Sequence, residues 1–273
     1  MTRLTLDEIH ACLLEILLDI DAFCRREGIR YSLGYGTLLG AVRQGGFIPW
    51  DDDADLIMPR EDFDRFVSTY PSDGRFHCLY NTINDKEFFV SGFAKVHDTL
   101  TDKFIGSRKY RSRYGVSVDI FPLDPLPDDP AERHALIQKA RHYSRRLGCF
   151  GKRFFHSNPL TMLQARLFGR NYWFGKCLET TRCVKPGSSS YIGVLMGATG
   201  FHNVFPKDFL DKPAEINFEG HSFLCPEDTD SHLRQIYGPD YITPPPVGQR
   251  RTHGDPVYRI DSLSSQGNSP SRE

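Results

Sequence analysis

The N-terminal segment repeats apolar side chains at the spacing of an amphipathic helix. Thr5 and Glu8 have the spacing of a capping box, in which the two side chains satisfy free N–H groups at a helix start. Apolar residues then recur every three or four positions as far as Phe23, and Gly28 supplies a stop. The pattern therefore predicts a helix that begins behind Thr5, ends near Gly28 and buries one face.

Shorter apolar runs along the rest of the chain predict strands, with turns and helices between them. The expected strands are 29–33, 54–58, 88–97 and 115–121. The expected helices are 38–44, 61–70 and two that begin after the capping residues Asp129 and Asn158. Pro122 and Pro125 should end the last of these strands, and residues 190–241 have strand-and-loop character. Because strands and helices are mixed rather than strictly alternating, we expect an α+β fold with a small mixed sheet.

The organisation that fits this pattern is a single catalytic domain over residues 1–260. The tail 261–273 is polar, and we expect it to be disordered. At about 130–186 we expect a helical insertion, which is strongly basic. The stretch 139–185 holds eleven Lys and Arg residues and one acidic residue, whereas the formal charge of the whole chain is only −1.

Two interpretations of the basic insertion stay open. It is either a helical lid with a solvated basic face, or a surface that contacts an anionic membrane or a polyanionic acceptor, with Phe168, Trp173 and Phe174 as anchors. No recognised nucleic-acid module is present, so we expect no nucleic-acid partner. The sequence contains no run of roughly 18 apolar residues, and we expect a cytoplasmic protein, with peripheral contact at the inner membrane face as an option.

The candidate chemistry lies in an aspartate-rich stretch that leads into the strand 54–58. Residues two apart share one face of a strand, so Asp51, Asp53 and Asp55 should point the same way. Three carboxylates on one face repel one another unless a cation lies between them. Oxygen ligands favour Mg²⁺ or Mn²⁺. The alternative is an ordinary solvated, aspartate-rich loop.

Two further features complete the candidate site. Gly36 and Thr37 lie where a strand gives way to a short helix, so their backbone N–H groups are candidates for binding phosphate. Asp119 is a single carboxylate within an apolar strand, where burial is costly unless the group is paired or bound to metal. We expect it to complete the metal site or to accept the acceptor's proton; otherwise it is a surface residue near the strand end.

The sequence resembles the LicD family. That family's signature pairs G-T-L-L-G-A-x-R with F-I-P-W-D-D-D-x-D, and here the two segments are 36–43 and 47–55. Further matches are 119–124, 205–207, 218–220, 237–238 and 250–253. The resemblance implies a nucleotidyltransferase core of the polymerase-β type. In that core the glycine turn is Gly36–Thr37, the metal-binding pair is Asp53 and Asp55, and the third carboxylate is Asp119.

The resemblance also implies an activity and its partners. Family members transfer phosphocholine or a related phospho-alcohol from a CDP-activated donor to a glycan, such as a teichoic acid or lipopolysaccharide precursor that is often lipid-linked. Further candidates for binding the donor phosphates are Lys95, Arg250, Arg251 and, more weakly, His253. One alternative is a nucleotidyltransferase that makes a CDP-activated compound and releases pyrophosphate. The other is a non-catalytic protein that binds glycan or membrane.

Overall fold

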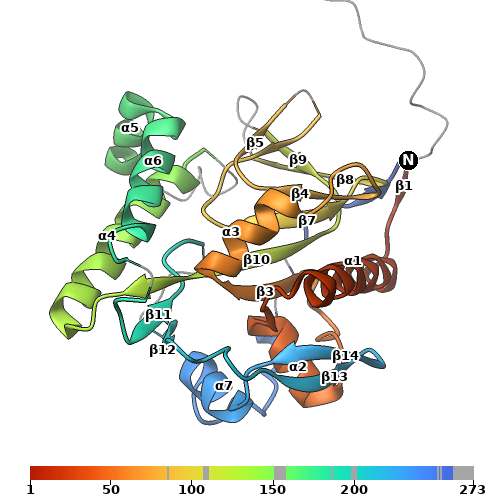
Figure 1. Cartoon of the computed structure of the whole chain (residues 1–273). Coiled ribbons are helices and arrows are strands. Elements are labelled where there is room, and N and C mark those ends of the chain that lie inside the picture. The colour runs from red at the N-terminus through yellow and green to blue at the C-terminus, as the bar shows by residue number, and fades with distance from the viewer. Residues whose placement is uncertain are drawn as a thin grey trace, which may run out of the picture.

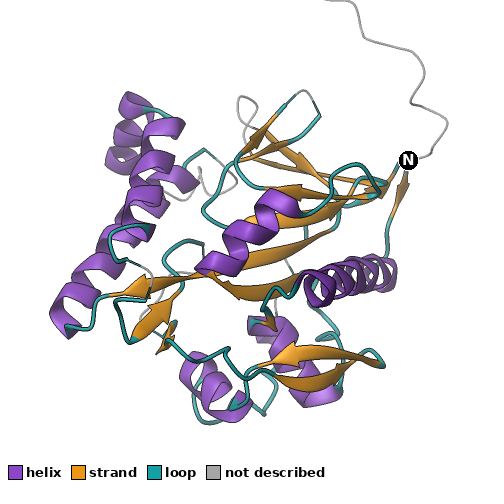
Figure 2. Cartoon of the chain, viewed as in Figure 1, coloured by secondary structure: helices purple, strands orange, loops and turns teal. Residues whose placement is uncertain are grey.

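The structure is a computed structural model that describes residues 1–84, 86–106, 111–150, 158–185, 187–197, 202–250, 252 and 254–260. These residues form seven α-helices, a central sheet of seven strands and three smaller sheets (Figure 1, Figure 2). The helices are α1 (Leu6–Glu27), α2 (Tyr35–Gln44), α3 (Arg60–Thr69), α4 (Pro130–Gly148), α5 (Pro159–Phe168), α6 (Arg170–Thr181) and α7 (Thr229–Tyr237), with a 3-10 turn η2 (Val247–Gln249).

The central sheet is mixed. Its strands lie in the order β12, β11, β10, β3, β2, and β7 pairs with β10 and with β4. Only β3 and β10 pair in parallel there; the other pairs are antiparallel. These strands are β2 (Ser32–Leu33), β3 (Ala54–Pro59), β4 (Phe76–Leu79), β7 (Ala94–Asp98), β10 (Ser117–Leu126), β11 (Tyr191–Gly193) and β12 (Val204–Pro206). The mixture of helices and strands is confirmed, although the sheet is larger than predicted.

The smaller sheets lie at the edges of the molecule. One is built in the order β1, β15, β8, β9, and the other two are the pairs β13–β14 and β5–β6. Their bounds are β1 (Thr2–Arg3), β5 (Thr82–Ile83), β6 (Phe88–Phe89), β8 (Thr101–Gly106), β9 (Arg111–Tyr114), β13 (Ala214–Phe218), β14 (His221–Cys225) and β15 (Tyr258–Arg259). The predicted strand 88–97 is therefore two strands, β6 and β7, that belong to different sheets.

Helix α1 begins and ends as the sequence predicts. Thr5 and Glu8 form the capping box, and Gly28 closes the helix with a left-handed φ of 63°. The apolar stripe is buried against the central sheet, and Leu13, Ile16 and Ile20 are fully covered. Burial of each such side chain contributes roughly 1.5–3 kcal/mol, so this helix is a principal support of β10 and β7.

Two local predictions around the site were wrong. The strand expected at 29–33 covers only Ser32–Leu33, and α2 already begins at Tyr35, so Gly36 and Thr37 lie in its first turn. Strand β10 also continues through Pro122 and Pro125. At each proline β10 has a partner on one side only, β3 at Pro122 and β11 at Pro125, so a missing N–H is tolerated there.

Helices α4, α5 and α6 pack on one another to one side of the strands (Figure 2). Asp129 and Asn158 cap α4 and α5 with their side chains, as the sequence predicts. Helix α7 lies within 190–241, where strands and loops were expected, and Asp228 caps it. The tail 261–273 lies outside the described residues.

Candidate active site

The centre of the candidate site is a row of three charged residues on neighbouring strands. Asp55 of β3 and Asp119 of β10 are direct register partners in the parallel pair. Asp119 is also the register partner of Lys95 on β7, and the Lys95 ammonium donates to the Asp119 carboxylate. The sheet therefore aligns two carboxylates and one ammonium that are far apart in the sequence.

The other two predicted carboxylates reach this row from the loop before β3. Asp51 and Asp53 lie outside the strand, so the expected two-residue alternation does not apply to them. Both nevertheless lie close enough to Asp55 for their charges to shift its pKa. Gly36 explains part of this approach, since a Cβ there would lie 2.9 Å from Asp51 Oδ2.

Helix α2 places its N-terminal turn beside the row. The Asp55 N–H donates to Thr37 Oγ1 at 2.8 Å, and the Gly34 N–H donates to the Asp55 carbonyl at 2.9 Å. The Thr37 hydroxyl therefore fixes the helix against β3. The first-turn N–H groups of Gly36 and Thr37 carry the partial positive charge of a helix start, which suits an anion.

The charges of the row do not balance. Burial first, and then the charges of Asp53 and Asp119, raise the pKa of Asp55 well above its usual range. Asp51 acts in the same direction, and Lys95 opposes it. Burial alone would lower the pKa of Lys95, but Asp119, Tyr114 and Asp53 together outweigh it and the pKa is raised. Four carboxylates thus lie around the Lys95 ammonium, and the charge of Lys103 reaches only Asp119 among the pKa shifts of the row. The excess of negative charge fits a site for a divalent cation with oxygen ligands.

Two tyrosines beside the row were not predicted. Tyr35 begins α2 with a left-handed φ of 44°, and its buried hydroxyl has no hydrogen-bond partner. Burial and then Asp55 raise its pKa. Tyr237, at the end of α7, has a raised pKa, first through desolvation and then through the charge of Asp55. A tyrosine between Gly34 and Gly36 was the sequence signal for the first; nothing comparable marks the second.

The C-terminal segment packs on the loop that carries the aspartates. Thr252 Oγ1 donates to the Trp50 carbonyl at 2.6 Å, and the Gly254 N–H donates to Asp52 Oδ2 at 3.2 Å. The guanidinium of Arg250 lies 4.2 Å from the centre of the Trp50 ring and is exposed. Arg250 is thus beside the loop. The predicted Arg251 and His253 lie outside the described residues, whereas Asp52 fixes the segment.

A second cluster of possible ligands lies on the same sheet. His77, Glu87 and His97 have ligand atoms within 4.8 Å of one another, a spacing that no other such trio reaches within the described part of the chain. The repelling aspartates are more widely spaced. The Gly115 N–H donates to His97 Nδ1 at 3.1 Å, so His97 Nε2 carries the proton and donates to Glu87 at 3.1 Å. That tautomer leaves Nε2 no lone pair for a metal.

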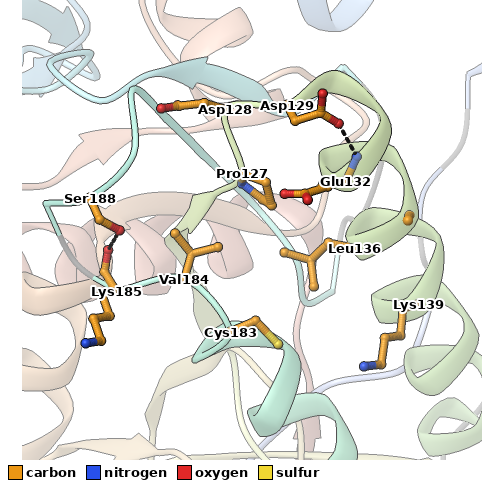
Figure 3. A pocket seen from close by; sticks show the side chains of 11 residues that line it. Pro127, Asp128, Asp129, Glu132, Leu136, Lys139, Cys183, Val184, Lys185 and Ser188 are labelled. Carbon is orange, nitrogen blue, oxygen red and sulfur yellow. Dashed lines mark hydrogen bonds between the residues drawn. The ribbon is translucent and has the colours of Figure 1, made fainter.

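A cavity of about 720 Å³ lies away from both clusters, between the start of α4 and the end of α6 (Figure 3). Two of its three acidic side chains, those of Asp128 and Asp129, already have structural partners. Asp129 accepts from the N–H groups that begin α4, and Asp128 accepts from the Ser190 N–H at 2.7 Å. None of the aspartates of the row lines it. We therefore place the candidate chemistry at the row and not in this cavity.

Comparison with known proteins agrees with the motif. The family model described as "LicD/FKTN/FKRP, nucleotidyltransferase domain" matches residues 28–165. The chain is 33% identical over 261 residues to the lipopolysaccharide cholinephosphotransferase LicD of Haemophilus influenzae, covering 93% of this chain and 97% of that protein. It is also 39% identical over 113 residues to an uncharacterized protein of Rickettsia typhi, covering 41% of this chain and 34% of that protein. The chain belongs to the LicD family.

Proposed function

We propose that the chain is a Mg²⁺-dependent transferase that moves phosphocholine, or a similar phospho-alcohol, from a CDP-activated donor to a cell-surface glycan. The observation that carries the proposal is the register of Asp55, Asp119 and Lys95 on three adjacent strands. A row with excess negative charge beside a helix start suits a bound diphosphate and its cation. The similarity to a lipopolysaccharide cholinephosphotransferase supports the choice of donor group and acceptor.

In this proposal the side chains have separate tasks. Asp53 and Asp55, with Asp51 beside them, would hold Mg²⁺, and Mn²⁺ is an alternative that the same oxygen ligands allow. When bound, the ion supplies positive charge that neutralises the donor diphosphate. The N–H groups of Gly36 and Thr37 bind phosphate oxygens at the start of α2.

Asp119 has a different task from the other carboxylates. It orients the acceptor hydroxyl and takes its proton as the hydroxyl oxygen bonds to the donor phosphorus. The phosphorus–oxygen bond to CMP breaks in the same step, so CMP leaves. Burial raises the pKa of the Asp119 carboxyl, and Lys95, whose buried ammonium donates to it, opposes that shift and holds the side chain in place. Lys95 thus positions Asp119 in this scheme, in contrast to the phosphate-binding role expected from the sequence.

The test is a panel of CDP-activated alcohols with Mg²⁺ and a lipopolysaccharide acceptor. We expect CMP release that needs both the acceptor and the ion, and transfer of the labelled head group to the glycan. Pyrophosphate release from CTP would instead indicate the synthesis of a CDP-activated compound. If neither product forms and calorimetry detects no Mg²⁺ binding, the proposal is wrong and the chain is a binding protein.

A further inference from the structure

Helix α5 has its large apolar side chains on the outside. Leu160, Leu163 and Leu167, at the spacing of one helix face, are 63%, 55% and 70% exposed. The opposite face packs through the small residue Ala165, which is 1% exposed, and through Met162. This is the reverse of a soluble amphipathic helix, which buries its leucines. Figure 1 shows α5 at the outer end of the helical region, away from α7 and β13–β14.

The exposed apolar face continues onto the start of α6. Phe168 and Tyr172 are 56% and 42% exposed and stack on each other with ring centres 4.8 Å apart. The other predicted anchors are not available, because Trp173 and Phe174 are buried in the core of the helical region. The exposed stripe therefore consists of three leucines and two aromatic rings, and we call it the α5 face.

Two arginines lie on the helices that form the α5 face, within a strongly basic stretch of the chain. Arg166 is exposed on α5 itself, and Arg170 begins α6. The stretch 139–185 has eleven cationic residues and one acidic residue, a net charge of +10, so the rest of the chain carries −11 of the total of −1. Not every cation contributes to the surface: Arg146 is 8% exposed and lies 5.2 Å from the Trp173 ring centre. The positive charge is thus concentrated in the region that carries the exposed leucines.

We propose that the α5 face binds the anionic surface of a lipid bilayer, with the leucines and aromatic rings entering the interface and the arginines contacting lipid phosphates. Charge decides between a bilayer and a second copy of the chain. Two copies would place like-charged regions together, whereas an anionic leaflet complements them. None of the described helices is long and apolar enough to cross a membrane. Binding of the α5 face to a bilayer requires no catalytic turnover, so this proposal does not rest on the activity proposed above.

The experiment is cosedimentation of the full chain with vesicles of phosphatidylcholine alone and of phosphatidylcholine with one-third phosphatidylglycerol. We expect binding to the anionic vesicles that weakens as salt rises. The triple variant Leu160→Asp, Leu163→Asp and Leu167→Asp should lower the partition coefficient about 100-fold. Arg166→Glu with Arg170→Glu should lower it roughly tenfold or more. The matched control replaces three exposed apolar residues that lie elsewhere in the chain: Ile83→Asp, Leu100→Asp and Ile242→Asp. It should bind as the unaltered chain does.

Three results would overturn the proposal. The first is equal recovery of the unaltered chain with neutral and anionic vesicles, and the second is equal loss of binding in the control. The third is a dimer in light scattering that the leucine variant turns into a monomer, which would assign the α5 face to a second copy. Thermal melts establish that each variant folds. Turnover on a soluble acceptor should be unchanged in the leucine variant, so a failure here is distinct from a failure of the proposed activity.

Discussion

Strand β7 contributes one residue to each of two clusters of titratable side chains. The charge of the two clusters is compensated in different ways. Lys95 belongs to the cluster that we call the aspartate row, which consists of Asp55, Asp119 and Lys95 with Asp51 and Asp53 beside them. His97 belongs to the cluster with His77 and Glu87. The two β7 residues are two positions apart and so face the same side of the sheet. Glu87 accepts from both histidines and from Asn84 at 2.9, 3.1 and 3.1 Å. Its single charge is therefore satisfied within the protein.

The aspartate row is the opposite case. Asp55 is surrounded mainly by like charges, and Lys95 is already committed to Asp119. Hydrogen bonds within a cluster remove the need for an ion, whereas repelling carboxylates create it. The cluster whose ligand atoms lie closest together is thus the poorer candidate for a metal, and the more open cluster is the better one. Four changes test this difference.

The largest effect is expected from Asp55→Asn. Removing one carboxylate from the row should cut Mg²⁺-dependent turnover by roughly 10³-fold. The same change should raise the melting temperature of the metal-free protein, because it relieves repulsion. Turnover and thermal melts in the presence of EDTA or Mg²⁺ measure the two effects, and the added stability from Mg²⁺ should disappear in the variant.

Asp53→Asn should act in the same direction as Asp55→Asn, and Asp51→Asn more weakly, since Asp51 lies further from the strand. Glu87→Gln is the control from the other cluster, and it should keep both turnover and the stabilisation by Mg²⁺. Near-normal turnover in Asp55→Asn, or loss of the Mg²⁺ effect in Glu87→Gln, would reverse the assignment of the two clusters.

Asp119→Asn should have the second-largest effect. Loss of the proton acceptor should slow the chemical step by roughly 10²-fold, while calorimetry still detects Mg²⁺ and donor binding. The variant should also be less stable by about 3 kcal/mol, because the buried Lys95 ammonium loses its carboxylate. Adding Lys95→Met should restore stability but not turnover. If Mg²⁺ affinity falls together with turnover, Asp119 is a metal ligand instead.

The parts of the molecule that were predictable from the sequence depend on local signals. Helix α1 followed from a capping box, an apolar stripe and a glycine stop, all within one segment. The aspartates and the glycine turn were found because they lie within one motif. The pairing of Asp119 with Lys95 was not predicted, because it depends on the register between β7 and β10, which no local pattern encodes.

The same limit explains the errors. Prolines signal the end of a strand, yet β10 passes two of them because the neighbouring strands leave those edges unpaired. The sequence also gave no reason to place Trp173 inside and Leu163 outside, since both suit an apolar face. Which face of a helix is covered depends on the neighbours that pack on it. For α5 these are α4 and α6, and for α6 they are α4 and α5.

Tyr35→Phe tests whether the functional site extends from the aspartate row to the Tyr35 hydroxyl. If the partnerless hydroxyl contacts the donor, its loss should lower turnover roughly tenfold and leave stability unchanged or slightly higher. Tyr31→Phe is a matched control, because the Tyr31 hydroxyl has a partner and donates to Asp21 of α1. That variant should lose stability and keep its turnover. Unchanged turnover in Tyr35→Phe would make its strained backbone a structural feature only.

The smallest effect is expected from Glu87→Gln, and it concerns stability rather than activity. The hydrogen bond from His97, together with those from Asn84 and His77, lowers the pKa of Glu87 to about 2 from an ordinary value of 4.5. A carboxyl group with a lowered pKa stabilises the fold above its unfolded-state pKa and loses that contribution as the pH falls toward the folded-state value. At pH 6 the variant should therefore be less stable by roughly 1 kcal/mol. This difference in the free energy of unfolding should shrink between about pH 4.5 and pH 2, which urea melts across that range can follow. A difference that stays constant over that range would mean that the ionised carboxylate is not what holds the two histidines, and the contrast with the aspartate row would then fail.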